Sequence, residues 1–134
     1  MKSKVGLWID HRKAVVVSLT AAVVKTVRIA SHMKGHVRFS GGAYGAAAED
    51  HRDRRYTEQL YRYYDRVVSQ IRGAEVILIF GPGEAKGELR ARLESDAFGG
   101  RIACLETVDK MTDRQIAAKV RQHFGEEHAW RIPR

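Results

Sequence analysis

Val76-Ile77-Leu78-Ile79-Phe80-Gly81-Pro82-Gly83-Glu84 is the stretch of this sequence that decides the fold. Its first five residues are all apolar and do not alternate with polar ones, which is typical of a strand buried on both faces of a sheet. The Gly-Pro-Gly run that follows predicts a tight turn, and residues 84–96 predict a helix. A buried strand that leads directly into a helix is a building unit of α/β sheets.

Three more strands are predicted at the N-terminal end of the chain. Residues 5–9 and 14–19 are short apolar runs, and the four polar residues between them suit a hairpin loop. Residues 23–29 alternate between apolar and polar, so we expect one face of this strand to be in water. The first third of the chain is therefore predicted to be an antiparallel meander.

Two further helices and one strand are predicted. Residues 50–72 carry an apolar stripe at helical spacing, and Gly73 is expected to end this helix. Residues 101–105 predict the last strand. Thr112 and Gln115 predict a capping box that opens the final helix. The inward residues of the three helices are expected to be Tyr56, Leu60, Tyr63, Val67 and Ile71 in the first, Ala85, Leu89 and Leu93 in the second, and Ile116, Val120 and Phe124 in the third.

The order of these elements predicts one sheet. Strand–helix–strand units need right-handed crossovers and parallel pairing. The simplest solution places the first strand in the middle, with the meander on one side and the later strands on the other. We therefore expect residues 1–134 to form a single α/β domain with a five-stranded mixed sheet of order 3-2-1-4-5 and helices on both faces. This order is that of the ribonuclease H-like fold. Gly125 is predicted to end the last helix, which leaves a C-terminal tail at 126–134.

Composition narrows the class of protein. The chain has 134 residues, 44% of them hydrophobic, and a net charge of +8. A single cysteine, Cys104, excludes an internal disulfide. The apolar runs are much shorter than a membrane-spanning helix needs, so we expect a cytoplasmic protein with no membrane partner.

Positive charge is concentrated at the N-terminal end. Residues 1–45 hold eight Lys and Arg against one acid. Residues 40–50 are rich in Gly and Ala and predict a mobile loop between two groups of cations. Clustered cations with a nearby aromatic ring suit contact with phosphates and bases. The predicted RNA-binding residues are Arg12, Lys13, Lys34, Arg38, Gly41, Gly42, Tyr44, Arg52, Arg54 and Arg55. The alternative is a solvated face beside a loop.

Three carboxylates follow strands of the predicted sheet. Asp10, Glu84 and Asp109 come after the first, fourth and fifth strands, whose carboxyl ends share one edge. Such carboxylates can hold Mg²⁺ or Mn²⁺ and activate water against a phosphodiester. The alternative roles are a turn for Asp10 and Asp109 and a helix-dipole contact for Glu84. A metal cofactor is expected only if this nuclease hypothesis holds.

The turn after the fourth strand offers a candidate anion site. Gly83 permits close backbone approach, and Lys86 adds a positive charge near the start of a helix. The alternative is a structural strand-to-helix turn, since the spacing matches neither of the familiar nucleotide-binding motifs. His11 lies beside Asp10 at the same edge.

The runs at residues 6–11 and 76–86, and above all Gly-Pro-Gly-Glu-Ala-Lys at 81–86, resemble a known group. The chain is similar to small bacterial proteins related to the middle domain of archaeal and eukaryotic peptide-chain release factors and of Pelota-type ribosome-rescue factors. The resemblance covers nearly the whole chain. It implies a ribonuclease H-like fold and an association with the ribosome or with tRNA.

In the release factors, a loop bearing Gly-Gly-Gln promotes hydrolysis of peptidyl-tRNA. This sequence has Gly41 and Gly42 in the corresponding region, followed by Ala43 instead of glutamine. The resemblance therefore implies a non-catalytic module that binds the ribosome or structured RNA without a cofactor. Two alternatives stay open: the metal-dependent nuclease, and a homodimer or other protein-interaction module that uses a helix face around Tyr61 and Tyr64.

Overall fold

A five-stranded sheet and three helices make up the described part of the chain. The computed structural model describes residues 3–20, 23–32, 46–95 and 101–131. The elements in chain order are β1 (Ser3–Ile9), β2 (Lys13–Leu19), β3 (Val24–Ala30), α1 (Ala46–Ile71), β4 (Ala74–Gly81), α2 (Ala85–Ser95), β5 (Ile102–Thr107) and α3 (Asp113–Arg131).

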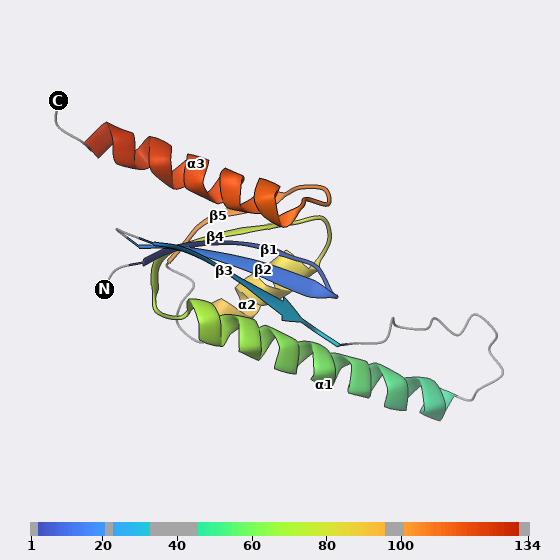
Figure 1. Ribbon diagram of the computed structural model, residues 1–134. Helices are drawn as coiled ribbons and strands as arrows, with labels where there is room; N and C mark the ends of the chain where they lie inside the picture. The colour runs from blue at the N-terminus through green and yellow to red at the C-terminus, as the bar shows by residue number, and fades with distance from the viewer. Residues whose placement is uncertain (1–2, 21–22, 33–45, 96–100, 132–134) are drawn as a thin grey trace.

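The strand order confirms the predicted sheet. It is β3-β2-β1-β4-β5. β2 is antiparallel to both β1 and β3, whereas β4 is parallel to both β1 and β5. The sheet is therefore mixed. The carboxyl ends of its parallel strands β1, β4 and β5 lie at one edge, to the right in Figure 1. This is the ribonuclease H-like arrangement.

Helices cover both faces of the sheet, as predicted. α1 and α2 lie on one face and α3 lies on the other (Figure 1). In α2 and α3, the buried residues are those expected from helical spacing: Ala85, Leu89 and Leu93 in α2, and Ile116, Val120 and Phe124 in α3. None of the helices in the described ranges has the length and hydropathy of a membrane span.

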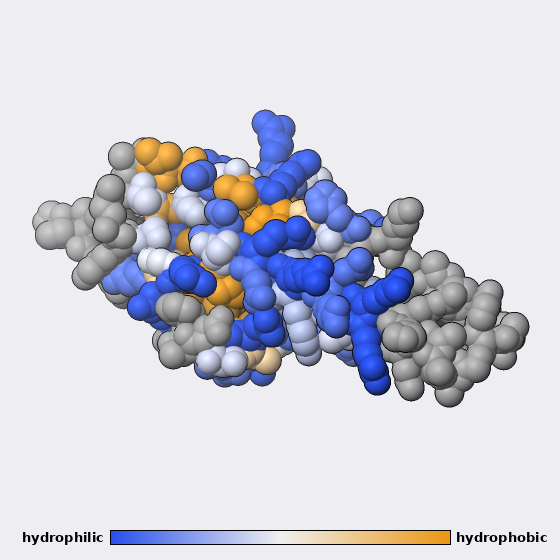
Figure 2. Space-filling view, turned by 90° about the horizontal axis from the view of Figure 1, so that it is seen from below, coloured by the Kyte–Doolittle hydropathy of each residue, from blue (hydrophilic) through white to orange (hydrophobic). Residues whose placement is uncertain are grey.

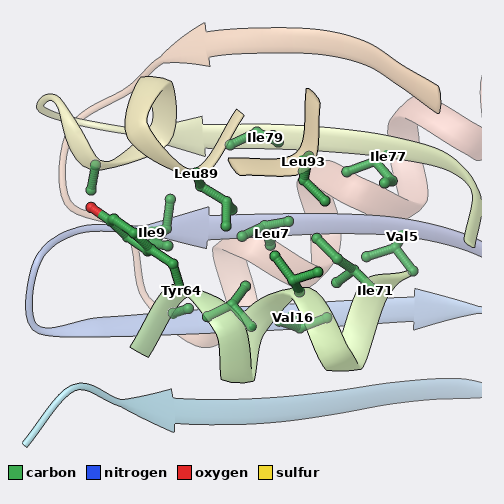
Figure 3. Packing of buried hydrophobic residues seen from close by; sticks show 14 of the residues in the cluster. Val5, Leu7, Ile9, Val16, Tyr64, Ile71, Ile77, Ile79, Leu89 and Leu93 are labelled. Carbon is green, nitrogen blue, oxygen red and sulfur yellow. The ribbon is translucent and has the colours of Figure 1, made fainter. Parts of the chain in front are cut away.

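The larger core lies between the sheet and the pair α1 and α2. Figure 3 shows Leu7 and Ile79 from adjacent strands, with Ile71 of α1 and Leu93 of α2, in one layer. Each of these four side chains is 0% exposed. Four residues of the predicted α1 stripe are buried, and Tyr56 is partly buried. Tyr64 and Val68 are buried as well, so the apolar face of α1 is wider than the predicted stripe.

The smaller core lies under α3. It contains Trp8, which is fully buried and whose indole Nε1 donates to the carbonyl of Asp109 at 3.2 Å. The predicted capping box at the start of α3 is confirmed: the Thr112 amide donates to Gln115 Oε1 at 2.8 Å, and the Gln115 amide donates to Thr112 Oγ1 at 3.2 Å. These bonds satisfy amides that the first helical turn leaves without partners.

Two helix boundaries differ from the prediction. α1 begins at Ala46, so residues 46–50 are helical and are not part of the loop predicted at 40–50. Ala46-Ala47-Ala48 explains the difference, because alanine has the highest helix propensity. The rest of that loop lies outside the described residues.

The predicted end of the last helix at Gly125 is wrong, because α3 continues to Arg131. A glycine inside a helix costs only about 1 kcal/mol relative to alanine. The glutamates at 126 and 127 and Ala129 favour helix and carry it past this position. Most of the tail predicted at 126–134 is therefore helical.

Gly81 allows the ends of the two central strands to come together. A Cβ atom at this position would lie 2.3 Å from the Ile9 carbonyl oxygen, which is backbone and cannot rotate away. The Gly81 carbonyl in turn accepts a hydrogen bond from the Val108 amide at 3.0 Å. Glycine is therefore needed here for the close approach of β1 and β4.

We predict that Gly81→Ala destabilises the fold by about 1–3 kcal/mol, the usual cost of overpacking. Gly87→Ala is the matched control, because a Cβ at Gly87 meets nothing within 4 Å and the residue lies inside α2. Removing a helical glycine should stabilise by about 0.5–1 kcal/mol. Urea unfolding of both variants measures the two free energies, and equal values would contradict the role given to Gly81.

We expect the two tyrosines buried in α1 to link the stability of the fold to pH at high pH. Burial raises the pKa of Tyr63 and Tyr64 above the ordinary value, and for Tyr64 the hydrogen bond to Glu88 raises it further. Below about pH 10, both the folded and the unfolded chain keep these protons. Above that pH the unfolded chain loses them first, so the stability that they contribute is lost as the pH rises.

We predict that the free energy of unfolding falls above pH 10 by about 1.4 kcal/mol per pH unit for each buried tyrosine. Tyr64→Phe should remove one such contribution and flatten the slope. Urea titrations at pH 8, 10 and 11 check this expectation. The same slope in the wild type and in Tyr64→Phe would show that the unfolding equilibrium is not linked to this hydroxyl.

Candidate functional site

The loop between β1 and β2 lies at the carboxyl edge of the parallel strands. Asp10 shapes it: one carboxylate oxygen, Oδ1, accepts hydrogen bonds from the amides of Arg12 at 2.7 Å and Lys13 at 2.8 Å. The Tyr63 hydroxyl donates to the Asp10 carbonyl at 3.0 Å. These bonds give Asp10 the turn-forming role that was the alternative to metal binding.

The structure does not gather the three carboxylates of the nuclease hypothesis. Asp10 points at its own turn, and Glu84 lines a cleft between α1 and α2. The backbone of Asp109 contacts Trp8, whose side chain belongs to the core under α3. Across the four described ranges, no three His, Cys, Asp or Glu side chains lie close enough to share a metal ion.

The predicted anion site at Gly83 and Lys86 is at the start of α2. The Lys86 ammonium turns back and donates to the Gly83 carbonyl at 2.5 Å. A Cβ atom at Gly83 would meet nothing within 4 Å, so no protein atom requires glycine there. Anion binding at this turn stays a prediction.

Glu88 of α2 joins three elements at the same edge of the sheet. Its Oε1 lies 3.0 Å from His11 Nε2 and accepts from the Tyr64 hydroxyl at 2.5 Å. The side chains of His11 and Glu88 are 38% and 39% exposed, whereas Tyr64 is buried. Burial and Glu88 together also raise the pKa of Tyr56. The loop after β1 and the two helices are thus held around one carboxylate.

A cleft of about 570 Å³ opens between α1 and α2 beside this carboxylate. It has a carboxylate-bearing wall from α2 and an aromatic wall from α1. The lining residues are His11, Tyr56, Thr57, Leu60, Tyr61, Glu84, Glu88, Ala91 and Arg92.

Arg92 and Tyr61 meet at this cleft. The Arg92 guanidinium lies over the Tyr61 ring, 4.6 Å from its centre. It also donates from Nε and from one terminal nitrogen to the two carboxylate oxygens of Asp65, at 2.9 and 3.0 Å. A planar guanidinium held by a ring and a carboxylate is a favourable arrangement, because cation–π attraction and two charge-assisted hydrogen bonds act together.

The protein-interaction hypothesis needs a correction at Tyr64. That side chain is 0% exposed and contacts the larger core, so it is not part of an exposed helix face. Tyr61 is 46% exposed and does face solvent. Tyr64 directs its hydroxyl to Glu88 because its ring packs against the sheet while its oxygen needs a partner.

The sequence did not point to Glu88, Tyr56 or Arg92 as members of a site. One signal was present: Glu84 and Glu88 are four residues apart in a predicted helix, so they share a face. The other side of the cleft depends on the packing of α1 against α2, which periodicity does not reveal.

Of the predicted RNA-binding cations whose side chains the structure describes, three are exposed and the fourth, Lys13, contacts an aromatic ring. Arg12 is exposed in the loop after β1, and Arg54 and Arg55 are exposed in the N-terminal half of α1, whose end extends past the sheet in Figure 1. Lys13 differs, because its ammonium lies over the Trp8 ring, 5.6 Å from its centre, on the α3 side of the sheet. The face seen from the α1 side is mostly hydrophilic (Figure 2).

The side chains of the other predicted RNA-binding residues lie outside what the structure describes. The Arg52 backbone belongs to α1, but its side chain is outside what the structure describes. The residues that lie outside the described ranges altogether are Lys34, Arg38, Gly41, Gly42 and Tyr44.

Comparisons with known proteins bear on the fold. At the level of sequence, no family model matches the chain and no curated protein does either. Among solved structures, the Pelota protein of Thermoplasma acidophilum is similar with a TM-score of 0.58 and 13% identity, over 94% of this chain. Pelota of Archaeoglobus fulgidus gives 0.54 and 14% over 97%. The archaeal translation termination factor aRF1 gives 0.55 and 10% over 95%.

The chain spans only part of each of these proteins. It covers 34% and 38% of the two Pelota chains and 40% of the aRF1 chain. Identities of 10–14% establish a shared fold and nothing finer. The chain therefore has the fold of one portion of Pelota and of aRF1, with its five-stranded sheet and three helices in the ribonuclease H-like order.

Proposed function

We propose that this chain is a non-catalytic, translation-associated module that binds the ribosome or structured RNA. The observation that carries the proposal is the set of exposed arginines at the carboxyl edge of the sheet. Arg54 and Arg55 lie in the N-terminal half of α1, whose end extends past the sheet in Figure 1, and Arg12 lies in the loop between β1 and β2.

The geometry of α1 supports a role for these cations in contact with a large partner. The Tyr63 hydroxyl anchors the helix to the hairpin loop at Asp10. A helix rises about 1.5 Å per residue, so Arg54 and Arg55 lie on the order of 12 Å further out along the axis. Within the described residues, no carboxylate forms an ion pair with Arg12, Arg54 or Arg55. Among the described residues, therefore, no carboxylate competes with a phosphate group for these three charges.

The translation setting rests on the fold and on the resemblance in sequence. aRF1 is an archaeal translation termination factor, and the portion of aRF1 that matches this chain has this fold. Ala43 replaces the glutamine of the hydrolytic motif of the release factors. Loss of that side chain removes the group associated with hydrolysis but leaves a cationic surface for binding, which is why we propose a non-catalytic role.

We predict that a triple variant, Arg52→Ala, Arg54→Ala and Arg55→Ala, weakens sedimentation with ribosomes from the cell of origin. Removing one arginine–phosphate interaction should reduce the slope of log K against log salt by about 0.7–0.9, so the triple variant should have a slope smaller by roughly two units. Affinity at low salt should fall on the order of tenfold or more. Co-sedimentation between 50 and about 200 mM salt measures both quantities.

A matched control removes three arginines from other parts of the chain. Arg72→Ala, Arg90→Ala and Arg121→Ala change exposed residues in the segment after α1, in α2 and in α3, with the same decrease in net charge. If both triple variants weaken binding equally, binding follows net charge alone and the assigned surface is wrong. If the wild type does not sediment with ribosomes at any salt and binds no structured RNA, the proposed function fails.

A further inference from the structure

The cleft between α1 and α2 carries carboxylates, whereas the chain as a whole has a positive net charge. The protein carries a net charge of +8, yet one wall of the cleft presents Glu84, the residue before α2, and Glu88 of α2. The Arg92 guanidinium at this cleft is already paired with Asp65, and the His11 ring lies against Glu88. The cleft therefore repels phosphate and attracts a cation.

The opposite wall of the cleft adds aromatic surface. Tyr56 and Tyr61 line it from α1, with Leu60, which is 6% exposed, between them. The faces of tyrosine rings carry negative potential and attract cations. A carboxylate wall facing an aromatic wall favours a group that is both charged and flat.

The chain already holds one such group at the rim of the cleft. The Arg92 guanidinium lies 4.6 Å from the centre of the Tyr61 ring and forms a two-point contact with the Asp65 carboxylate. This contact shows that a tyrosine of α1 and a nearby carboxylate accommodate a guanidinium in this environment. Glu84 and Glu88 lie in the same cleft as Tyr56 and repeat that combination of chemical groups.

We propose that this cleft is a docking site for an arginine side chain presented by a basic segment of a partner protein. The guanidinium would lie between the carboxylates of Glu84 and Glu88 and the aromatic wall. Glu88 is suited to this role because its Oε1 is held by Tyr64 and His11, which orients the carboxylate before binding. Arginine is favoured over lysine because its planar head both stacks on rings and binds carboxylates in a fork.

The size of the cleft supports a peptide as the source of the guanidinium, and screening by salt limits the effect of distant positive charges on its binding. A volume of about 570 Å³ exceeds what one guanidinium fills, and it accommodates the stem and flanking backbone of an extended segment. At physiological salt, charges further than about 8 Å away are screened, so Glu84 and Glu88 decide binding locally despite the positive net charge. This inference goes beyond the proposed RNA-binding function and does not depend on it.

The test titrates the full-length protein with three short capped peptides, Gly-Arg-Gly, Gly-Lys-Gly and Gly-citrulline-Gly. Citrulline keeps the shape of arginine but has no charge. NMR shifts of the His11 ring and the Tyr56 and Tyr61 rings report on the cleft. We expect saturable shifts with a millimolar Kd for the arginine peptide, weaker binding for the lysine peptide, and no saturation for the citrulline peptide.

Three variants locate the binding. Glu88→Gln should raise the Kd of the arginine peptide by about tenfold, and Glu84→Gln, at an exposed position, by about threefold. Glu94→Gln removes an exposed carboxylate from the same helix outside the cleft lining and should leave the Kd unchanged. Because Glu88 also holds Tyr64, circular dichroism checks the fold of each variant, and Glu84→Gln tests the site even if Glu88→Gln does not fold.

Four outcomes would overturn the proposal. One is equal binding of the arginine and citrulline peptides. A second is an equal effect of Glu84→Gln and Glu94→Gln. A third is a shift of the tyrosine rings by an RNA oligonucleotide but not by the arginine peptide, which would make the cleft part of the RNA surface. A fourth is a dimer, detected by light scattering, that Glu84→Gln dissociates, because the occupant would then be a second copy of the chain.

Discussion

The parallel pairing of β1 with β4 is the constraint on which the rest of the structure depends. It joins strands from either side of α1 in the chain, and six residues of β1 from Ser3 to Trp8 have partners in β4. Both strands are buried on both faces, so the pairing organises both cores at once. The absence of a side chain at Gly81 lets the end of β4 approach Ile9, where a Cβ would meet the backbone oxygen at 2.3 Å. The same pairing directs the hairpin loop and the start of α2 to one edge of the sheet.

The parts of the fold that the sequence predicts well are those in which burial alone sets the pattern. The apolar run that ends at Phe80 is typical of a strand buried on both faces, and Leu89 and Leu93 have the spacing of one buried helix face; both predictions are confirmed. Helix ends were predicted less well. Gly125 resembles a stop signal, but the cost of one glycine is small beside the propensity of the residues after it, and α3 continues to Arg131.

The candidate site was predicted only in part, for a different physical reason. Asp10 and Glu84 were expected at one edge because strand order alone places the ends of strands together. The hydrogen bond from Tyr64 to Glu88 arises only when α1 and α2 pack, and it joins residues 24 positions apart. Helical spacing says that Tyr64 is near the apolar stripe, but it does not say that a carboxylate will lie opposite its hydroxyl. Contacts between side chains of separate helices are beyond what periodicity can predict.

The outer strand of the meander has a consequence for association of the folded chain. Within the described ranges, β3 has a pairing partner on one side only, so the amides and carbonyls of its other side face outward. Such a border can template the addition of foreign strands and lead to aggregation. Lys25 and Arg28 are exposed on β3, one on each face, and another strand added there would have to bury or displace their hydration. Arg28 is also tied to Asp113 at the start of α3, which holds its charge beside the border. These charges make the addition of another strand at this border less favourable.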